Sequence, residues 1–217
     1  MPKYYDVEQN SEEWYELRAP RFTSSQIYRL INDRGDKLSK GAETYVYEVC
    51  ENIIYPQEYF DDLGDNPIQA MQRGHDLEPL ARFAYEMQTD SIVTQCGFFA
   101  ENDHYGGSPD GCVQDEGGVI EIKCPLNKAK FIKYSMFKNS EDLRKNQKDY
   151  FWQCHSHINL TGSDWCDFIA FDDRKKMIPN MHIMQLERDQ ECIDKINHFL
   201  SLAIEMKMNI LTDLKII

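Results

Sequence analysis

The sequence has no C-x-x-C pair, although its 217 residues include seven cysteines. This odd, scattered set predicts neither a disulfide framework nor a zinc ribbon, and it favours a reducing compartment, which we expect to be the cytoplasm. No apolar run approaches the roughly 18–20 residues that cross a bilayer, so we expect no membrane association. The acidic first 16 residues lack the positive flank and apolar stretch of a secretory signal.

Basic charge is also scarce, because 24 Lys and Arg residues accompany 37 Asp and Glu residues and leave a net charge of -13. Such a balance argues against a protein that simply coats nucleic acid. Residues 41–121 carry 2 basic and 17 acidic side chains, whereas residues 122–150 carry 8 basic and 3 acidic ones. The basic segment could track a phosphate backbone, or it could be an ordinary solvated helix surface. Its basic residues are Lys123, Lys128, Lys130, Lys133, Lys138, Arg144, Lys145 and Lys148.

Hydrophobic periodicity predicts helices, then a strand-rich centre, then a closing helix, which together form a mixed α/β (α+β) core. The predicted helices cover residues 11–17, 23–31, 44–54, 68–88, 131–134, 148–160 and 189–207. The predicted strands cover residues 91–94, 97–99, 119–123, 165–171 and 181–184. We therefore expect a single domain over residues 1–217, with a helical part at about 1–90, a sheet core at about 91–185 and a C-terminal helix at about 189–207.

One group of charged residues carries a chemical signal. Asp110 lies in a tight turn, and Glu121 and Lys123 follow on a predicted strand. A period of two places Glu121 and Lys123 on one face of that strand, with Ile120 and Ile122 directed into the core. Converging carboxylates repel each other unless a cation lies between them, and their oxygens favour Mg²⁺ or Mn²⁺. A neighbouring lysine can orient a water or stabilise phosphate charge. The alternative is an exposed strand with an ordinary Glu–Lys pair.

These residues resemble a known nuclease pattern. Gly-Ser-Pro-Asp-Gly at 107–111, followed by Ile-Glu-Ile-Lys-Cys-Pro at 120–125, resembles the PD-(D/E)xK superfamily, and more narrowly the phage lambda exonuclease or YqaJ-like viral recombinase family. Blocks at residues 14–25, 73–86 and 150–155 extend the likeness in the same order. The resemblance implies a restriction-endonuclease-like core, which is a central mixed sheet flanked by helices.

The resemblance also implies roles for the residues of the motif. Asp110 and Glu121 would be metal ligands, and the carbonyl of Ile122 would supply a third oxygen. Lys123 would position or activate the attacking water. The cofactor would be Mg²⁺, for which Mn²⁺ can substitute. No iron–sulfur cluster is expected, because the late cysteines do not form a tight group.

Two further residues of the predicted helix at 68–88 correspond to family positions. Glu78 would project to the same site and act on a second metal or its water. Its alternative is a surface ion pair with Arg82, four residues later on the helix. Met71 falls where the family carries an apolar wedge that separates the terminal base pair, although a helical methionine is more often a core residue.

A third set corresponds to the family's site for the 5′ phosphate of a DNA end. Its members here are Arg18, Ser25, Ser108 and Gln153. A guanidinium supplies a forked pair of donors that suits phosphate oxygens. The alternatives are a surface arginine at a helix end for Arg18 and capping or turn roles for the serines. His155 and His157 lie two apart on a predicted helix, point in different directions and predict no metal site.

Together these observations predict a Mg²⁺-dependent 5′→3′ exonuclease that degrades one strand of double-stranded DNA from its ends. Its 3′ single strands would serve recombination by strand annealing. The resemblance further implies a homotrimeric ring, a single-strand annealing protein as partner, and a phage or prophage protein in a bacterial host. Two alternatives stay open: a PD-(D/E)xK endonuclease or repair nuclease, and a catalytically inactive protein that binds DNA ends.

Overall fold

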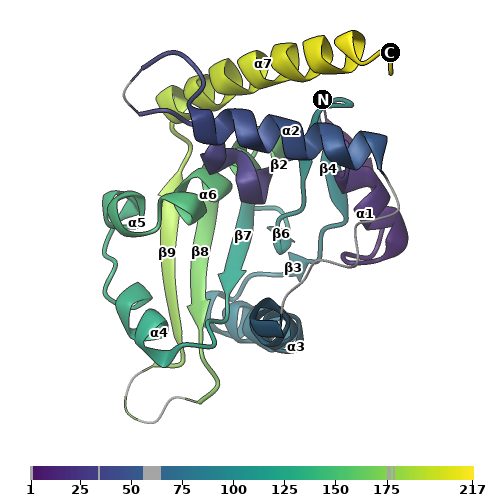
Figure 1. Ribbon diagram of the computed structural model, residues 1–217. Helices are drawn as coiled ribbons and strands as arrows, with labels where there is room; N and C mark the ends of the chain where they lie inside the picture. The colour runs from purple at the N-terminus through teal and green to yellow at the C-terminus, as the bar shows by residue number, and fades with distance from the viewer. Residues whose placement is uncertain (1, 34, 56–64, 175–176, 178) are drawn as a thin grey trace.

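A mixed sheet forms the centre of the protein (Figure 1). The computed structural model describes residues 2–33, 35–55, 65–174, 177 and 179–217, and for residues 65–71 it describes the backbone alone. Within that part, the central sheet has five strands in the order β3-β6-β7-β8-β9. β7 and β8 are parallel, and the other neighbours are antiparallel. The strands are β3 (Val93–Thr94), β6 (Gly111–Val113), β7 (Gly118–Lys123), β8 (Trp165–Phe171) and β9 (Met181–Glu187).

A second sheet joins the N-terminal region to the centre of the chain. In the described residues it has four strands, in the order β1-β4-β5-β2. The strands are β1 (Lys3–Tyr5), β2 (Phe22–Thr23), β4 (Phe98–Ala100) and β5 (Tyr105–Gly107). The sequence predicted β4 but not the other three strands. Strands of two or three residues are too short to show an alternating pattern, so the part expected to be helical contains two of them.

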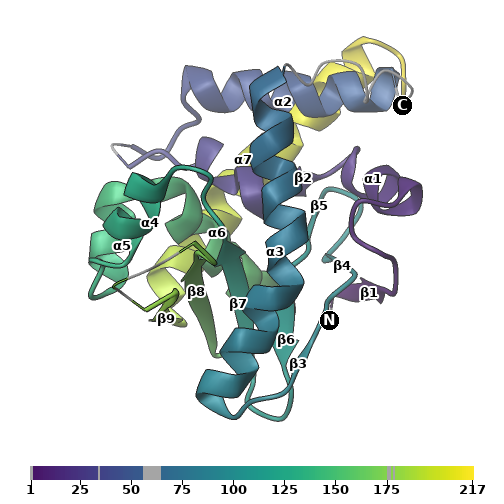
Figure 2. The ribbon, with the colours of Figure 1, turned by 90° about the horizontal axis from the view of Figure 1, so that it is seen from below.

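Helices cover both faces of the central sheet. Figures 1 and 2 show α3 across one face, while α6 lies on the other face with α2 and α7 beyond it. The mixed α/β architecture with flanking helices confirms the predicted fold class. The helices are α1 (Glu12–Arg18), the 3-10 helix η1 (Ser24–Arg29), α2 (Lys40–Ile54), α3 (Asp65–Thr89), α4 (Lys128–Tyr134), α5 (Ser140–Asn146), α6 (Lys148–Thr161) and α7 (Gln190–Asp213).

Most of these helices begin at polar caps that the sequence supplies. Ser11 accepts a hydrogen bond from the backbone N–H of Trp14, and Asp189 accepts from two backbone N–H groups at the start of α7. Gly162 ends α6 in the left-handed region, at φ 75°. Among the described residues, no helix is both long enough and apolar enough to cross a bilayer.

The strand that carries the motif is buried on both faces, which the period-two prediction did not foresee. Ile120 and Ile122 pack in one apolar cluster with Ala81 and Tyr85 of α3. Val119 packs in a second and larger apolar cluster, the larger core cluster, with residues of α2, α6 and α7. A central strand between two helical layers has no solvent face, because both sides of the sheet are covered. Glu121 is therefore only 1% exposed, although the pattern had placed it on an accessible face.

The cysteines differ in part from the expectation. A disulfide joins Cys96 and Cys112, whereas we expected no disulfide framework. It connects the segment before β4 to β6, immediately after the turn that contains Asp110. The other cysteines are free and buried, as small packing residues often are; they are Cys50, Cys124, Cys154, Cys166 and Cys192.

Candidate active site

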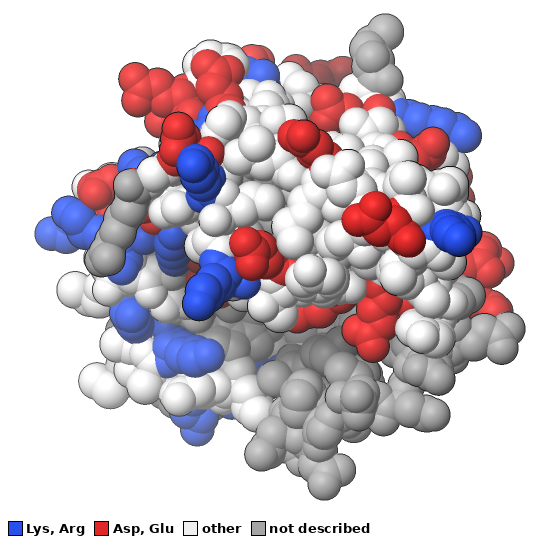
Figure 3. Space-filling view, turned by 45° about the horizontal axis from the view of Figure 1, so that its top comes forward, with Lys and Arg blue, Asp and Glu red and all other residues white. Residues whose placement is uncertain are grey.

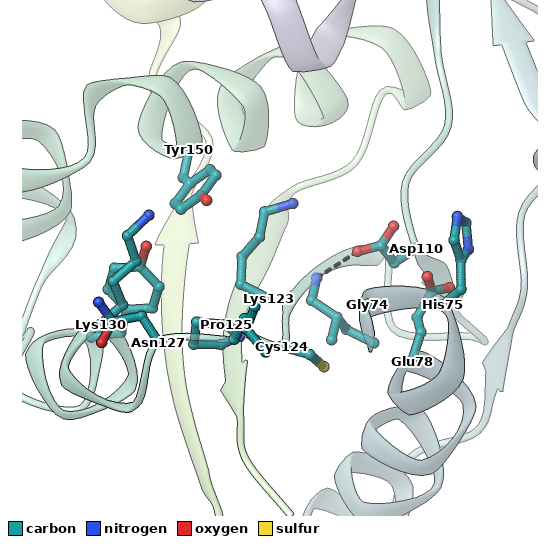
Figure 4. Close-up of a pocket in the computed structure, with 13 residues that line it drawn as sticks. Gly74, His75, Glu78, Asp110, Lys123, Cys124, Pro125, Asn127, Lys130 and Tyr150 are labelled. Carbon is teal, nitrogen blue, oxygen red and sulfur yellow. Dashed lines mark hydrogen bonds between the residues drawn. The ribbon is translucent and has the colours of Figure 1, made fainter. Parts of the chain in front are cut away.

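A cavity of about 590 Å³ opens where the end of β7 meets α3, α4 and α6. Figure 4 shows Glu78 and Asp110 on one side of it and Lys130 and Tyr150 on the other, with Lys123 between them. The remaining walls come from α3 and from the loop after β7. The lining residues are Gly74, His75, Glu78, Asp110, Ile122, Lys123, Cys124, Pro125, Leu126, Asn127, Lys130, Tyr134 and Tyr150.

Asp110 is positioned by β7. It precedes β6, and its backbone N–H donates to the carbonyl of Ile120 at 3.1 Å. Its Oδ2 accepts the backbone N–H of Ile122 at 2.6 Å, which is the dashed contact in Figure 4. The antiparallel hairpin of β6 and β7 therefore places this carboxylate beside the residue between Glu121 and Lys123. The Asp110 carboxylate also lines the cavity.

Glu121 lies behind the cavity wall. Its Oε1 accepts a hydrogen bond from Lys123 Nζ, and its Oε2 is 2.9 Å from Nε2 of His157 on α6. Lys123 reaches forward from the same strand face, with Nζ 5.0 Å from the centre of the Tyr150 ring. That ring stacks on Phe168. The lysine is therefore held between a carboxylate and an aromatic face.

Glu78 faces the cavity and also forms the ion pair with Arg82 that its sequence position allowed. It lines the cavity, and its Oε1 accepts from Arg82 Nη2 at 2.7 Å, four residues further along α3. The ion pair uses one carboxylate oxygen and leaves Oε2 for another ligand. His75, one turn earlier on α3, lines the same wall.

The wall formed by residues 124–127 is fixed by a buried acid at the end of β8. Asp172 is 3% exposed and pairs with Arg174 at 2.8 Å and with Arg73 of α3 at 3.3 Å. Arg174 in turn donates to the carbonyls of Pro125 and Leu126, both at 3.0 Å. One carboxylate therefore connects the helix that carries Glu78 to the opposite wall.

The electrostatics distinguish the three acids. Burial, together with the charges of Glu121 and Glu78, raises the pKa of Asp110 well above its usual range. Burial also raises the pKa of Glu78, and Glu121 adds to that effect while Arg82 opposes it. Burial would raise the pKa of Glu121 as well, but Lys123 and His157 outweigh it and lower that pKa. Burial alone would lower the pKa of Lys123, but the charges of Glu121 and Asp110 outweigh burial and raise that pKa.

The carboxylates of Asp110, Glu121 and Glu78 supply the oxygen ligands that a hard divalent cation prefers. Three carboxylates from α3, the turn before β6 and β7 interact repulsively, and a cation would relieve the repulsion. No group of three or more His, Cys, Asp or Glu side chains among the described residues is already gathered as a metal cluster. Each of the three carboxylates has at least one oxygen engaged by a protein donor. Ile122 also lines the cavity.

Three of the four predicted phosphate-binding residues, Arg18, Ser25 and Ser108, fall into one network around Trp14. Arg18 Nη2 donates to Ser25 Oγ at 2.8 Å, and its guanidinium lies 4.8 Å from the centre of the Trp14 ring. The indole N–H of Trp14 donates to Ser108 Oγ at 2.8 Å. Residues from two separate sequence blocks are thus brought together through Trp14, which the sequence prediction did not include in the site.

A glycine permits the close approach that this network needs. A Cβ at Gly107 would fall 2.3 Å from Ser24 Oγ and 2.8 Å from Ser24 Cβ. A side chain there would push β5 away from η1, and Ser108 would move with it. Gln153 lies on α6 and is 9% exposed. Ser156, one turn later, donates to Ser24 Oγ at 2.9 Å, so this face of α6 meets η1.

Met71 lies on α3, and its side chain is outside the part of the chain that the structure describes. The wedge role therefore stays a prediction.

The basic segment divides into paired and solvated members. Lys148 pairs with Asp33 at 2.5 Å, and Lys145 pairs with Glu141 at 3.7 Å. Lys128, Lys130, Lys133 and Lys138 are exposed on and just after α4. Figure 3 shows Lys and Arg gathered on the side where Figure 1 places α4 and α5, with Asp and Glu spread over the rest of the visible face.

His157, like Trp14, is a site residue that sequence reasoning missed. It was considered only as a partner of His155 and was set aside because the two point apart. A better signal was its spacing from Gln153, since residues four apart share a helix face. That spacing would have placed His157 on the same side of α6 as Gln153, a predicted site residue.

Comparisons with known proteins agree with this geometry. Residues 13–164 match the family described as YqaJ-like viral recombinase domain. An alkaline exonuclease, LHK-Exo, from Laribacter hongkongensis is 29% identical, and the match covers 94% of this chain and 96% of that one with a TM-score of 0.78. The same figures hold for its complex with dAMP. A phage-related exonuclease from Haemophilus somnus 129PT is 17% identical over 89% of this chain and 96% of that one, with a TM-score of 0.72, and supports the fold alone. A search of curated proteins gave no match.

Proposed function

This chain belongs to the family of YqaJ-like viral recombinase domains, and on that premise we propose that it is a Mg²⁺-dependent 5′→3′ exonuclease acting on the ends of double-stranded DNA. The coarser statement, a DNA exonuclease that serves recombination, follows from the family and from the likeness to alkaline exonucleases. The metal, the direction and the product are our proposal. The observation that carries it is the meeting of Asp110, Lys123 and Glu78 around one cavity, with Glu121 directly behind.

The residues of the chain suggest their roles. Asp110, Glu121 and Glu78 would hold Mg²⁺, with Mn²⁺ as a substitute and Ile122 as a further oxygen donor. When bound, the ion would polarise the scissile phosphate and lower the pKa of a water. Lys123 is the cation of the site, and its Nζ can orient that water or stabilise charge on the phosphate. Tyr150 and Glu121 restrict where Nζ can lie.

The network of Arg18, Ser25 and Ser108 supports a site for the terminal 5′ phosphate. An arginine held by a serine and an aromatic ring is preorganised, so little side-chain entropy is lost when a phosphate binds. Gln153 would complete the site from α6. Such a site would set the distance between the end of the DNA and the cavity, and it would explain why cleavage begins at ends.

The product and the setting of the reaction extend the proposal. Removal of one strand would leave 3′ single strands for strand annealing, and a single-strand annealing protein would be the partner. A homotrimeric ring around DNA, in the cytoplasm of a bacterial host that carries a phage or prophage, fits the family. The exposed lysines on and after α4 offer a surface for the duplex backbone.

The test is digestion of a linear duplex labelled at one 5′ end, with and without Mg²⁺, beside a closed circle of the same DNA. We expect Mg²⁺-dependent release of labelled mononucleotides from the linear form and an intact circle. Cutting of the circle would support an endonuclease instead. Binding without cleavage in either Mg²⁺ or Mn²⁺ would support an inactive end-binding protein.

The same substrate tests the phosphate site. Arg18→Ala should reduce the rate on a 5′-phosphorylated end more than on a 5′-hydroxyl end, because the guanidinium contact is lost only on the former. Duplexes with the two kinds of end, compared at equal Mg²⁺, measure this difference. Equal loss on both ends would remove Arg18 from its assigned role.

A further inference from the structure

A buried histidine contacts the acid at the back of the site. Nε2 of His157 lies 2.9 Å from Oε2 of Glu121, and each side chain is 1% exposed. The other oxygen of Glu121 accepts from Lys123. The carboxylate is thus held at both oxygens, by one residue of its own strand and by one of α6.

The direction of the contact follows from the chemistry. A carboxylate accepts hydrogen bonds, so Nε2 of His157 must carry the hydrogen and donate it. Nδ1 of the same ring is buried and has no hydrogen-bond partner among the described residues. The ring therefore makes a single polar contact in this part of the chain, and that contact is to Glu121.

Packing alone does not require a histidine at this position. α6 already buries Trp152, Cys154 and Ile158 completely, and these apolar side chains bind the helix to the larger core cluster. A leucine would fill much of the same space without burying polar nitrogens. The polar ring of His157 is therefore better explained by its contact with the Glu121 carboxylate than by packing.

We propose that His157 is a positioning residue that fixes the orientation of the Glu121 carboxylate for a divalent cation. This inference rests on the proposed function, which makes Glu121 a metal ligand. A donor behind a metal-binding carboxylate orients it and thereby affects metal affinity. Without His157, Glu121 could rotate and give both oxygens to Lys123, which would compete with the cation.

The chain offers a matched control in His155. It lies two residues earlier on α6, is 2% exposed, and also has an unpartnered buried Nδ1. Its ring packs 4.5 Å from the centre of the Phe151 ring and makes no contact with Glu121 in the described structure. A substitution there disturbs the same buried helix without touching the acid.

The experiment measures Mn²⁺ binding to the full-length protein without DNA, by isothermal titration calorimetry, together with thermal unfolding in a chelator. The variants are His157→Leu, His157→Gln, His155→Leu and Glu121→Gln. We expect His157→Leu to weaken Mn²⁺ binding by about 10- to 100-fold. His157→Gln keeps an N–H donor and should recover part of that loss. His155→Leu should change the unfolding temperature but leave the Mn²⁺ affinity of the wild type.

Two results would overturn the inference. The first is wild-type Mn²⁺ affinity in both His157 variants. The second is an equal loss of affinity in His157→Leu and His155→Leu, since that would indicate a general disturbance of α6. Because His157→Gln conserves polarity, it decides the question if the leucine variant does not fold.

The outcomes also separate this inference from the proposed function. Cleavage of the linear duplex is assayed on the same preparations. If Glu121 and His157 control Mn²⁺ affinity but the wild type releases no nucleotides, the positioning role stands and the nuclease proposal falls. If Glu121→Gln binds Mn²⁺ as the wild type does while the wild type still releases nucleotides, Glu121 is not a ligand, the positioning role falls and the nuclease proposal stands.

Discussion

Two buried acids on neighbouring strands illustrate how environment determines the role of a residue. Glu121 lies on β7 and Asp167 on β8, and they are 1% and 4% exposed. In the parallel register of the two strands, Ile120 is opposite Asp167 and Glu121 is opposite Phe168. This offset of one residue directs the acids to opposite faces of the sheet. Glu121 meets α6 and Asp167 meets α3.

Their partners differ in charge. Glu121 contacts Lys123 and His157, which outweigh the effect of burial and lower its pKa. Asp167 accepts a hydrogen bond from the hydroxyl of Tyr85 at 2.8 Å, and burial raises its pKa despite that contact. The comparison indicates that burial alone does not mark a functional acid. A buried acid that has charged partners beside a cavity is the better candidate.

The largest expected effect comes from neutralising each acid in turn. Glu121→Gln should reduce Mg²⁺-dependent cleavage by more than the roughly 10- to 100-fold that removal of a residue behind a metal ligand causes. Asp167→Asn should leave cleavage close to the wild-type rate, because its amide oxygen can still accept from Tyr85. Release of labelled nucleotides from a linear duplex measures both. Equal losses of cleavage in Glu121→Gln and Asp167→Asn would show that the two acids do not differ in function.

A smaller effect is expected from the partner of Asp167. Tyr85→Phe removes the donor and should lower the free energy of unfolding by about 1–3 kcal/mol, because a buried acceptor is left without its hydrogen bond. Tyr85 also lies two turns after Glu78 on α3, yet cleavage at saturating Mg²⁺ should persist. Urea denaturation provides the free energy. A stable Tyr85→Phe protein that cleaves poorly would show that this pair serves the site after all.

The smallest expected effect is a difference in pH dependence, measured in a chelator. The pKa of Asp167 in the folded protein is raised above its ordinary 3.8, so its contribution to stability is present at low pH and is lost as pH rises through that raised value. The pKa of Glu121 is lowered below its ordinary 4.5, so its contribution is present above 4.5 and is lost as pH falls through the lowered value.

Urea titrations between pH 7 and about 3 can compare each neutral variant with the wild type. As pH falls, the stability advantage of the wild type should grow over Asp167→Asn and shrink over Glu121→Gln. Trends of the same sign would contradict the assignment of one raised and one lowered pKa.

Much of the fold was accessible from the sequence because its long elements are periodic. The helix at 68–88 and the strands at 119–123 and 165–171 lie close to the observed α3, β7 and β8. The motif spacing also brought Asp110, Glu78 and Lys123 to one cavity. Their catalytic and metal-binding roles stay predictions.

The rest depended on contacts between distant segments. Alternation along β7 predicted one buried face, but helices from both ends of the chain cover both, and this places Glu121 behind the wall. The contacts of Trp14 with Ser108 and of His157 with Glu121 join residues 94 and 36 positions apart. Local periodicity contains no information on such pairs.

The parallel pairing of β7 with β8 has a consequence for the order of events during synthesis. β6 and β7 are consecutive and can form their hairpin as soon as both leave the ribosome. The partner on the other side, β8, follows only after the crossover of α4, α5 and α6. Until then the nascent chain exposes one edge of β7, and Glu121 is without the helix that buries it. The acids of the site are thus translated before α4, α6 and β8. The cavity can therefore be completed only after α6 has been synthesised.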